Sequence, residues 1–340
     1  MNTEKRRRGI TVAGSLIADE FYKIDTYPSE GMLTYARDRE GHIGGTGNMI
    51  LDLAKMDPEL PVTVSAVIGT DDRGEMLMNA LVPYPNIRTD QIVREGASTV
   101  TLVMNAQDTK QRTFFFIPEA SDRYDISYID WDSLDSEIFH LEYLLLMKQV
   151  DTADPDFGTH GARILYEAGK RGMKTSIDVV SEQSDRAKRI VTSALKYTDY
   201  CSINEIEAQG VTGMDLTSSA EALLANAEKA LRKLKEYGVR KWAVIHSPAY
   251  SFGYDCGNDR FVPVPSIQLP EGYIKGTNGA GDAYCSGILY AAQRGDSLEE
   301  AMHLAAACAV CSLSEENGTD GLRPWQEVLD AVKLFETEEK

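Results

Sequence analysis

The sequence contains no apolar run that reaches the roughly 20 residues needed to span a bilayer. Its first nine residues are polar and include a basic stretch at 5–8, and the hydrophobic residues that follow are soon interrupted by Asp19 and Glu20. This pattern does not supply the apolar core of a signal peptide. We therefore expect a cytoplasmic protein with no membrane partner.

Basic residues are scarce relative to acidic ones. The 340 residues include 35 Lys and Arg against 53 Asp and Glu, which gives a net charge of −18 at pH 7. Such a field repels nucleic acid, and the basic stretch at 5–8 is typical of a solvated tail. We expect no nucleic-acid partner. The same field does not help to capture a small anion, so a site for one has to rely on backbone amides and local side chains.

Cysteine is also rare, with five in the chain. Cys308 and Cys311 have C-x-x-C spacing, but they lie in a run of small apolar residues that is typical of a buried helix. Neither a second pair nor a histidine at zinc-finger spacing accompanies them. The pattern favours buried, reduced thiols over a metal site or a disulfide framework.

The chain does contain a regular alternation of strand-like and helix-like segments. We expect strands at 10–16, 62–68, 143–147, 174–179, 200–203 and 242–246, and helices at 48–56, 74–81, 157–171, 185–195, 218–237, 280–294 and 298–314. This alternation predicts an α/β fold, a mainly parallel sheet with helices on both faces. Ligands of such sheets bind at the carboxyl ends of the strands.

Two segments, about 20–43 and 99–117, interrupt this alternation with strand-like residues. We expect them to form a small β-lid outside the main sheet. No linker or repeat divides the chain, so residues 1–340 are expected to be a single domain. Because the lid strands leave unpaired edges, pairing with a second copy is one way to cover them. We therefore expect a homodimer through the lid.

A glycine-rich segment before the helix at 280–294 carries the clearest chemical signal. Gly279, Ala280 and Gly281 are small, so their amides can converge on an anion at a helix start. Asp282 follows and is placed to take a proton from an attacking hydroxyl. The alternative is a turn that leads into a helix, with Asp282 as a first-turn charge.

The segment Gly279-Ala280-Gly281-Asp282 resembles the C-terminal signature of the ribokinase, or PfkB, family of carbohydrate kinases. The resemblance extends along about the whole chain and includes residues 68–74, which are similar to the family's G-x-D-x-x-G element. It implies a ribokinase-like fold, ATP and Mg²⁺ as cofactors, an anion hole at Gly279, Ala280 and Gly281, and Asp282 as the catalytic base.

The resemblance also implies a substrate site near the start of the chain. Asp19 corresponds to the Asp after the family's first strand, which holds substrate hydroxyls, and Gly44, Gly45 and Asn48 lie in the Gly-rich substrate motif. A carboxylate can accept two sugar hydroxyls, and an amide can both donate and accept. The alternatives are a loop charge at Asp19 and a turn before a helix at 44–48.

The nucleotide and metal residues are implied in the same way. Asn204 and Glu207 match the N-x-x-E element, with Asn204 near the nucleotide and Glu207 near Mg²⁺, directly or through water. Their spacing also fits a helix N-cap in which the two side chains face each other. Thr277 and Ser247 are further candidates for nucleotide contacts.

Three departures from the family pattern affect these expectations. Gly276 stands where the family usually has an Asp that helps to hold a monovalent cation, so potassium activation is doubtful. His246, Ser247 and Pro248 replace the usual Thr-x-Gly contact to the nucleotide, and Ser247 is expected to take over that contact. The segment 178–182 also lacks the Asn and Arg that many sugar kinases have there.

The predicted function is ATP-dependent phosphoryl transfer to a hydroxyl of a small sugar or sugar-like substrate. Two alternatives remain open, a nucleoside kinase of the same fold and a ligand-binding relative without catalysis. A dinucleotide-dependent oxidoreductase is not supported, because Gly14 does not begin a G-x-G-x-x-G motif after the first strand.

Overall fold

The computed structural model describes residues 8–182 and 184–336. Most of the basic stretch at 5–8 therefore lies outside the described residues. In the described part, no helix is long and apolar enough to cross a membrane.

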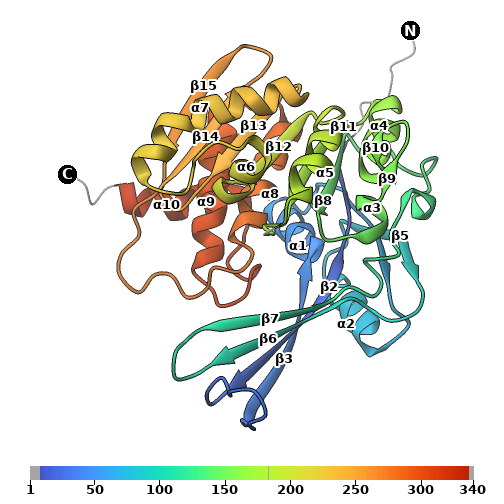
Figure 1. Cartoon of the computed structure of the whole chain (residues 1–340), viewed down its shortest axis with the longest axis vertical. Helices are drawn as coiled ribbons and strands as arrows, with labels where there is room; N and C mark the ends of the chain where they lie inside the picture. Colours follow the sequence, from blue (N-terminus) through green and yellow to red (C-terminus); the bar gives the residue numbers. More distant parts are fainter. Residues whose placement is uncertain (1–7, 183, 337–340) are drawn as a thin grey trace.

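A nine-stranded sheet forms the centre of the molecule (Figure 1), in the order β15-β14-β13-β12-β11-β8-β1-β4-β5. The strands from β13 to β5 pair in parallel, and the hairpins of β14 and β15 add an antiparallel edge. The strands are β1 (Ile10–Ala13), β4 (Val62–Ile68), β5 (Ile87–Arg94), β8 (Ile138–Leu144), β11 (Lys174–Val179), β12 (Tyr200–Asn204), β13 (Trp242–His246), β14 (Tyr250–Asp255) and β15 (Arg260–Pro265).

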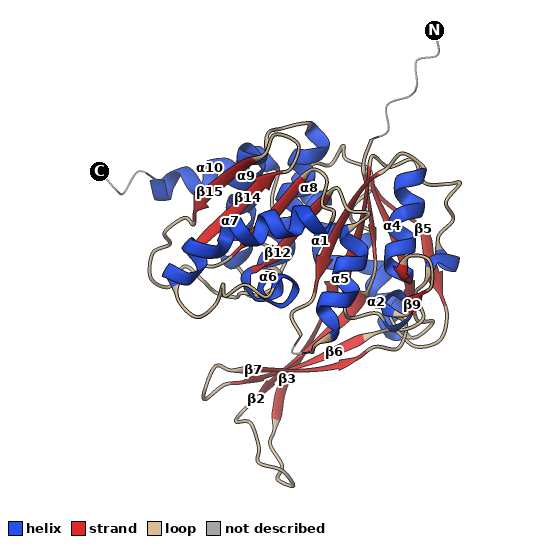
Figure 2. Ribbon diagram, turned by 45° about the horizontal axis from the view of Figure 1, so that its top comes forward, coloured by secondary structure: helices blue, strands red, loops and turns tan. Residues whose placement is uncertain are grey.

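Helices cover both faces of this sheet (Figure 2), because most of its strands are buried on both sides and need apolar cover. One hydrophobic cluster packs under α1 (Thr46–Met56), α2 (Asp72–Leu81), α8 (Ala280–Arg294), α9 (Leu298–Leu313) and α10 (Trp325–Glu336). The other packs under α4 (His160–Lys170), α5 (Arg186–Leu195), α6 (Glu205–Thr212) and α7 (Ala220–Tyr237). The short elements are α3 (Lys148–Asp151), η1 (Ile126–Tyr128), β9 (Ala153–Asp154) and β10 (Gly158–Thr159).

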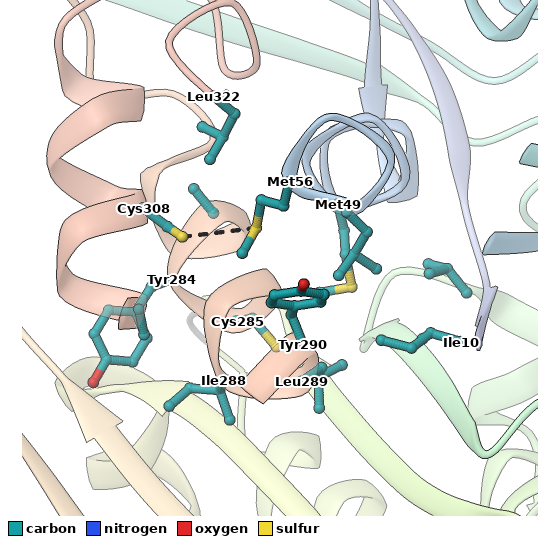
Figure 3. Packing of buried hydrophobic residues seen from close by; sticks show 14 of the residues in the cluster. Ile10, Met49, Met56, Tyr284, Cys285, Ile288, Leu289, Tyr290, Cys308 and Leu322 are labelled. Atoms are coloured by element: carbon teal, nitrogen blue, oxygen red, sulfur yellow. Dashed lines mark hydrogen bonds between the residues drawn. The ribbon is translucent and has the colours of Figure 1, made fainter. Parts of the chain in front are cut away.

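Close packing holds α8 against α9 and α1. Glycine is required at position 287, because a Cβ there would lie 2.5 Å from the Cα of Ala305. Cys308 points toward Met56 in this cluster (Figure 3), with 3.7 Å between the two sulfurs. All five cysteines are free and buried, so the prediction of small buried thiols is confirmed.

A separate four-stranded sheet, here called the small sheet, projects from one side of the body (Figure 1). Its strand order is β3-β2-β6-β7, and it comprises β2 (Leu16–Ile24), β3 (Ala36–Gly45), β6 (Val100–Ala106) and β7 (Arg112–Ile117). These strands come from the two segments that the sequence placed outside the main sheet. The carboxyl end of β3 runs directly into α1, which ties the small sheet to the body.

Two of the expected strands have the wrong limits. The strand expected at 10–16 divides at Gly14, whose φ of 149° ends β1, so that Leu16 already begins β2 in the other sheet. The strand expected at 143–147 is β8, and it starts earlier, at Ile138. Tyr143 and Leu145 have φ values of 61° and 79°, which end the strand where the sequence placed its start.

Candidate active site

The glycine-rich segment begins α8 at the carboxyl edge of the main sheet. Gly279 is the N-cap residue with φ 76°, and no side chain caps the helix. A Cβ at Gly279 would lie 2.6 Å from the Cα of Gly318, so only glycine fits this approach. The amides of the first turn are therefore left without a side-chain acceptor, as an anion site at a helix start requires.

Asp282 lies in the first turn of α8 and is 6% exposed. Asn48 Nδ2 on α1 donates to its Oδ2 at 2.8 Å, and the Tyr143 hydroxyl at the end of β8 donates to its Oδ1 at 2.9 Å. Burial raises the pKa of Asp282, while both donors lower it by stabilising the charged form. The carboxylate is thus held in one orientation by two distant segments.

Tyr143 is a site residue that the sequence did not reveal. Its hydroxyl donates to Asp282 Oδ1, and its backbone, near the end of β8, has a left-handed φ of 61°. Such a conformation is uncommon for a residue other than glycine and often marks functional sites. No local pattern in the sequence signals it.

Asp19 and Gly44 meet on adjacent strands of the small sheet. A Cβ on Gly44 would lie 2.1 Å from Asp19 Oδ2, so the carboxylate occupies the space that a side chain would fill. Gly45 has φ 60°, and a Cβ there would lie 2.2 Å from the Ser15 carbonyl oxygen. Burial, followed by the nearby charge of Asp282, raises the pKa of Asp19 to about 7, although a hydrogen bond from Thr101 opposes this. The two glycines therefore shape the wall around Asp19.

A cavity of about 400 Å³ lies between the small sheet and the start of α8. Among the described residues that line it, there is no Lys or Arg. Amide side chains dominate its polar wall, and these can both donate to and accept from hydroxyl groups. The polar lining side chains are Asp19, His42, Asn48, Asn79, Asn278, Asn317, Thr319 and Asp320.

Asp282 belongs to a cluster of three buried carboxylates. Glu142, Asp178 and Asp282 each offer an oxygen, and these oxygens lie within 4.8 Å of one another. Neither oxygen of Glu142 has a hydrogen-bond partner within the described part of the chain. Burial raises the pKa values of Glu142 and Asp178, and repulsion from neighbouring carboxylates adds to it, first from Asp282 at Glu142 and first from Glu207 at Asp178. A hard cation such as Mg²⁺ prefers oxygen ligands of this kind, so the donor set fits it.

The sequence as a whole matches one family along residues 9–325, described as pfkB family carbohydrate kinase. The chain belongs to the pfkB family of carbohydrate kinases. Ribokinase from Arabidopsis thaliana is 24% identical over 332 residues, which cover 96% of this chain and 81% of that protein. Ribokinase from Haemophilus influenzae is 21% identical over 330 residues, which cover 96% and 99%.

Solved structures share the fold of this carbohydrate kinase. Arabidopsis thaliana ribokinase complexed with ribose and ATP has a TM-score of 0.78 at 21% identity, and the match covers 96% of this chain and 99% of that one. A nucleoside kinase from Methanocaldococcus jannaschii gives 0.73 at 17% identity, covering 97% and 99%. The 2-dehydro-3-deoxygluconokinase from Thermotoga maritima gives 0.74 at 16%, covering 96% and 99%. The shared fold therefore does not select one acceptor.

In this kinase, Asn204 and Glu207 form a capping box at the start of α6. The Asn204 amide nitrogen Nδ2 and backbone N–H donate to the Glu207 carboxylate at 2.7 and 2.9 Å, and Ser181 Oγ donates to it at 2.7 Å. This is the helix-cap arrangement that the spacing also allowed. Since three donors already occupy the Glu207 carboxylate, a cation contact through water fits better than direct ligation.

Thr277 and Ser247, the other two candidates for nucleotide contacts, differ in whether the side-chain hydroxyl already has a hydrogen-bond partner. Thr277 is exposed in the loop before α8. Ser247 donates its hydroxyl to the Tyr250 carbonyl at 2.8 Å and accepts from the Tyr250 N–H at 3.1 Å. Its donor is therefore used to close the turn between β13 and β14.

Gly276 is buried against the backbone of residues 315 and 316. A Cβ there would lie 2.7 Å from the Glu316 carbonyl oxygen and 2.8 Å from that of Glu315. A carboxylate side chain cannot be accommodated at this position without moving the loop. The structure thus gives a steric reason for the departure from the family pattern.

Proposed function

We propose that this protein transfers the γ-phosphoryl group of ATP to a hydroxyl of an uncharged sugar or sugar-like polyol, with Asp282 as the general base. The observation that carries the proposal is the placement of Asp282. Its carboxylate is oriented by Asn48 and Tyr143 beside the uncapped first turn of α8. Asn48 also lines the cavity, whose amide side chains can bind hydroxyl groups.

The chemistry needs a proton acceptor and donors for the transferring group. The Asp282 carboxylate takes the proton of the acceptor hydroxyl while the oxygen of that hydroxyl forms a bond to the γ-phosphorus. The bond between the γ-phosphorus and the β,γ-bridging oxygen breaks, and ADP is released. The amides of Gly279, Ala280 and Gly281 donate to the non-bridging oxygens. Asp19, Gly44, Gly45 and Asn48 hold the acceptor.

Mg²⁺ neutralises charge on the phosphates when it is bound. Glu142 and Asp178 are the residues that would hold it, with Glu207 acting through water. In this proposal Asn204 and Thr277 contact the nucleotide. This assignment extends the role that the sequence gave to Glu207 alone.

The charge of the cavity supports an uncharged acceptor. Asp19 and Asp320 line it, and neither Lys nor Arg does so in the part of the chain that is described. A sugar acid or sugar phosphate would bring a further negative charge into this cavity, where no Lys or Arg among the described lining residues pairs with it.

A nucleoside is the second candidate for the acceptor, favoured by one contact. Phe21 and His42 form an edge-to-face pair with 5.5 Å between ring centroids, and both line the cavity. Their rings offer an apolar surface for a base. The remaining alternative is a ligand-binding relative without catalysis, and the intact surroundings of Asp282 argue against it.

Closure and dimerisation through the small sheet are part of the proposal. Strand β7 lies at its edge, where Phe114, Phe115 and Ile117 are 57%, 45% and 41% exposed. An exposed edge with apolar side chains is a surface that pairing with a second copy would cover. Light scattering at assay concentrations should give the mass of a homodimer, and a monomer would contradict this.

The experiment that tests the function is a screen for ADP release. Pentoses, hexoses, inositols, sugar acids and nucleosides are offered with ATP and Mg²⁺. We expect turnover with at least one uncharged polyol and the lowest kcat/KM with acids. Preference for a sugar acid over its neutral counterpart would contradict the charge argument, and preference for a nucleoside would select the second candidate.

A further inference from the structure

The chain connects the small sheet to the body at one end only. β2 begins at Leu16 and β6 at Val100, just after the chain leaves the body, and β3 and β7 end at Gly45 and Ile117, just before it returns. Leu16 pairs with Gly45, and Val100 pairs with Ile117. Since β2 also pairs with β6 near these residues, all four lie at the same end of the sheet. The rest of the sheet projects from this end (Figure 1), so its angle to the body depends on contacts made further along.

An ion pair links the small sheet to the body beyond this end. Arg73 of α2 donates its Nε–H to Glu20 Oε1 of β2 at 2.7 Å. Glu20 is four residues from the start of β2, which is about 13 Å along the strand. Helix α2 belongs to the body, because its Leu77 and Leu81 are buried in the first hydrophobic cluster. The pair therefore acts at a distance from the connected end, where it opposes rotation of the sheet.

The surroundings of Glu20 keep its carboxylate charged. Its side chain is 4% exposed, and it also accepts from the Tyr22 hydroxyl at 2.8 Å and from Arg39 Nη2 at 3.0 Å. Burial alone would raise the pKa of Glu20, but the hydrogen bonds from Arg73 and Tyr22, together with the two guanidinium charges, lower it. A hydrogen bond between two charged groups is shorter and stronger than one between neutral groups.

The ion pair lies beside the acceptor cavity and joins two of its walls. Asp19, next to Glu20 in β2, lines the cavity from the small sheet, and Met76, one turn after Arg73 in α2, lines it from the body. Successive residues of a strand point to opposite faces, so Glu20 reaches α2 without occupying the face on which Asp19 lies. A change in the angle of the sheet would move Asp19 relative to Asp282.

We propose that Arg73 is a positioning residue for the acceptor, because its ion pair with Glu20 holds the small sheet at the angle that places Asp19 correctly relative to Asp282. This rests on the proposed function, since it assumes that Asp19 holds the acceptor. A reacting group that is misplaced by about 1 Å can cost about 100-fold in rate, even when the altered residue is remote. The pair therefore contributes to use of the acceptor and not to nucleotide affinity.

A comparison of Arg73→Gln with Arg39→Gln separates the link from the charge. Both arginines donate to Glu20 Oε1, but Arg39 lies on β3, within the small sheet, and does not connect it to the body. We expect Arg73→Gln to lower kcat/KM for the acceptor about 10–100-fold, with ADP affinity within about twofold of wild type. Arg39→Gln should leave both quantities unchanged. Arg73→Lys keeps a charged donor and should recover part of the loss.

The angle of the sheet can also be measured without an acceptor. All five native cysteines are buried, so spin labels can be attached through Ala36→Cys on β3 and Ala225→Cys on α7, both at exposed positions. Ala36 pairs with Ile24 at the far end of β2, a nine-residue strand about 30 Å long, where a rotation of about 10° gives a displacement of roughly 5 Å. We expect the distribution of label distances to shift or broaden by about this amount in Arg73→Gln. It should not change in Arg39→Gln.

Thermal unfolding shows whether each variant is folded at the assay temperature. Wild-type kcat/KM in Arg73→Gln would overturn the proposal, and so would an equal loss in Arg39→Gln, because the charge at Glu20 would then be responsible. Label distances that are the same in Arg73→Gln and the wild type would also overturn it. Failure of the proposed function is distinct, since it would appear as absence of turnover by the wild type with every acceptor. The label distances would still test the ion pair in that case.

Discussion

Asp19 offers a perturbation whose effects on stability and on binding should have opposite signs. Asp19→Asn keeps the size of the side chain and removes its charge. The pKa of Asp19 is raised from its ordinary value of 3.8 to about 7, mainly by burial. Between these two values the folded protein keeps a proton at Asp19 that the unfolded chain has released. The free energy of unfolding of the wild type therefore falls as the pH rises from about 4 to about 7.

The size of the effect follows from the two pKa values. By linkage, the raised pKa of Asp19 lowers the free energy of unfolding of the wild type by about 4 kcal/mol at pH 8 and by about 2 kcal/mol at pH 5. Because asparagine does not ionise, Asp19→Asn does not lose this stability. Its free energy of unfolding should exceed that of the wild type, by an amount that grows with pH. At the same time it loses a charged acceptor for substrate hydroxyls, and the KM for the acceptor should rise by about tenfold or more.

Urea unfolding at pH 5, 6, 7 and 8, at constant ionic strength, measures the stability difference. Asp132→Asn, at an exposed position outside the site, controls for the loss of one negative charge. The reasoning is refuted if Asp19→Asn is no more stable than the wild type at pH 8, or if its advantage does not increase between pH 5 and pH 8. An unchanged KM for the acceptor would remove Asp19 from the substrate site.

Two further predictions concern the cations. Glu142→Gln should raise the Mg²⁺ concentration for half-maximal rate more than Glu207→Gln does, because the Glu142 oxygens have no protein donors among the described residues whereas Glu207 is held in the helix cap. If the dependence of the rate on Mg²⁺ concentration is the same in both variants as in the wild type, neither carboxylate binds Mg²⁺. Because Gly276 has no room for a carboxylate, KCl should activate weakly or not at all with choline chloride holding ionic strength constant. A saturable rise of about tenfold would contradict this.

The sequence predicted those parts of the fold that depend on local patterns. Segments rich in β-branched apolar residues, such as 62–68, marked buried parallel strands, and small residues before an amphipathic run marked the start of α8 correctly at Ala280. The strands of the small sheet were also recognisable, since they interrupt the alternation of strand and helix. The edge strands β5 and β15, and β14 next to β15, were not predicted, because they mix polar and apolar residues without a clear period.

The site was harder to predict where it depends on contacts between distant segments. The sequence could select Asp282 and Asn48 as separate candidates, but their hydrogen bond spans 234 residues. Tyr143 was missed because its hydrogen bond to Asp282 joins segments 139 residues apart. The alternatives at Ser247 and Glu207 could be weighed only once their hydrogen bonds were visible.

The central claim, that Asp282 is the general base, is tested most directly by single-turnover and steady-state kinetics of Asp282→Asn with the best acceptor from the screen. The amide keeps the size of the side chain but cannot take a proton. We predict that kcat falls by about 10²–10⁴-fold, the usual worth of general base catalysis, while ADP affinity stays within about twofold of wild type. Turnover at the wild-type rate in a variant that still binds ADP would contradict the account.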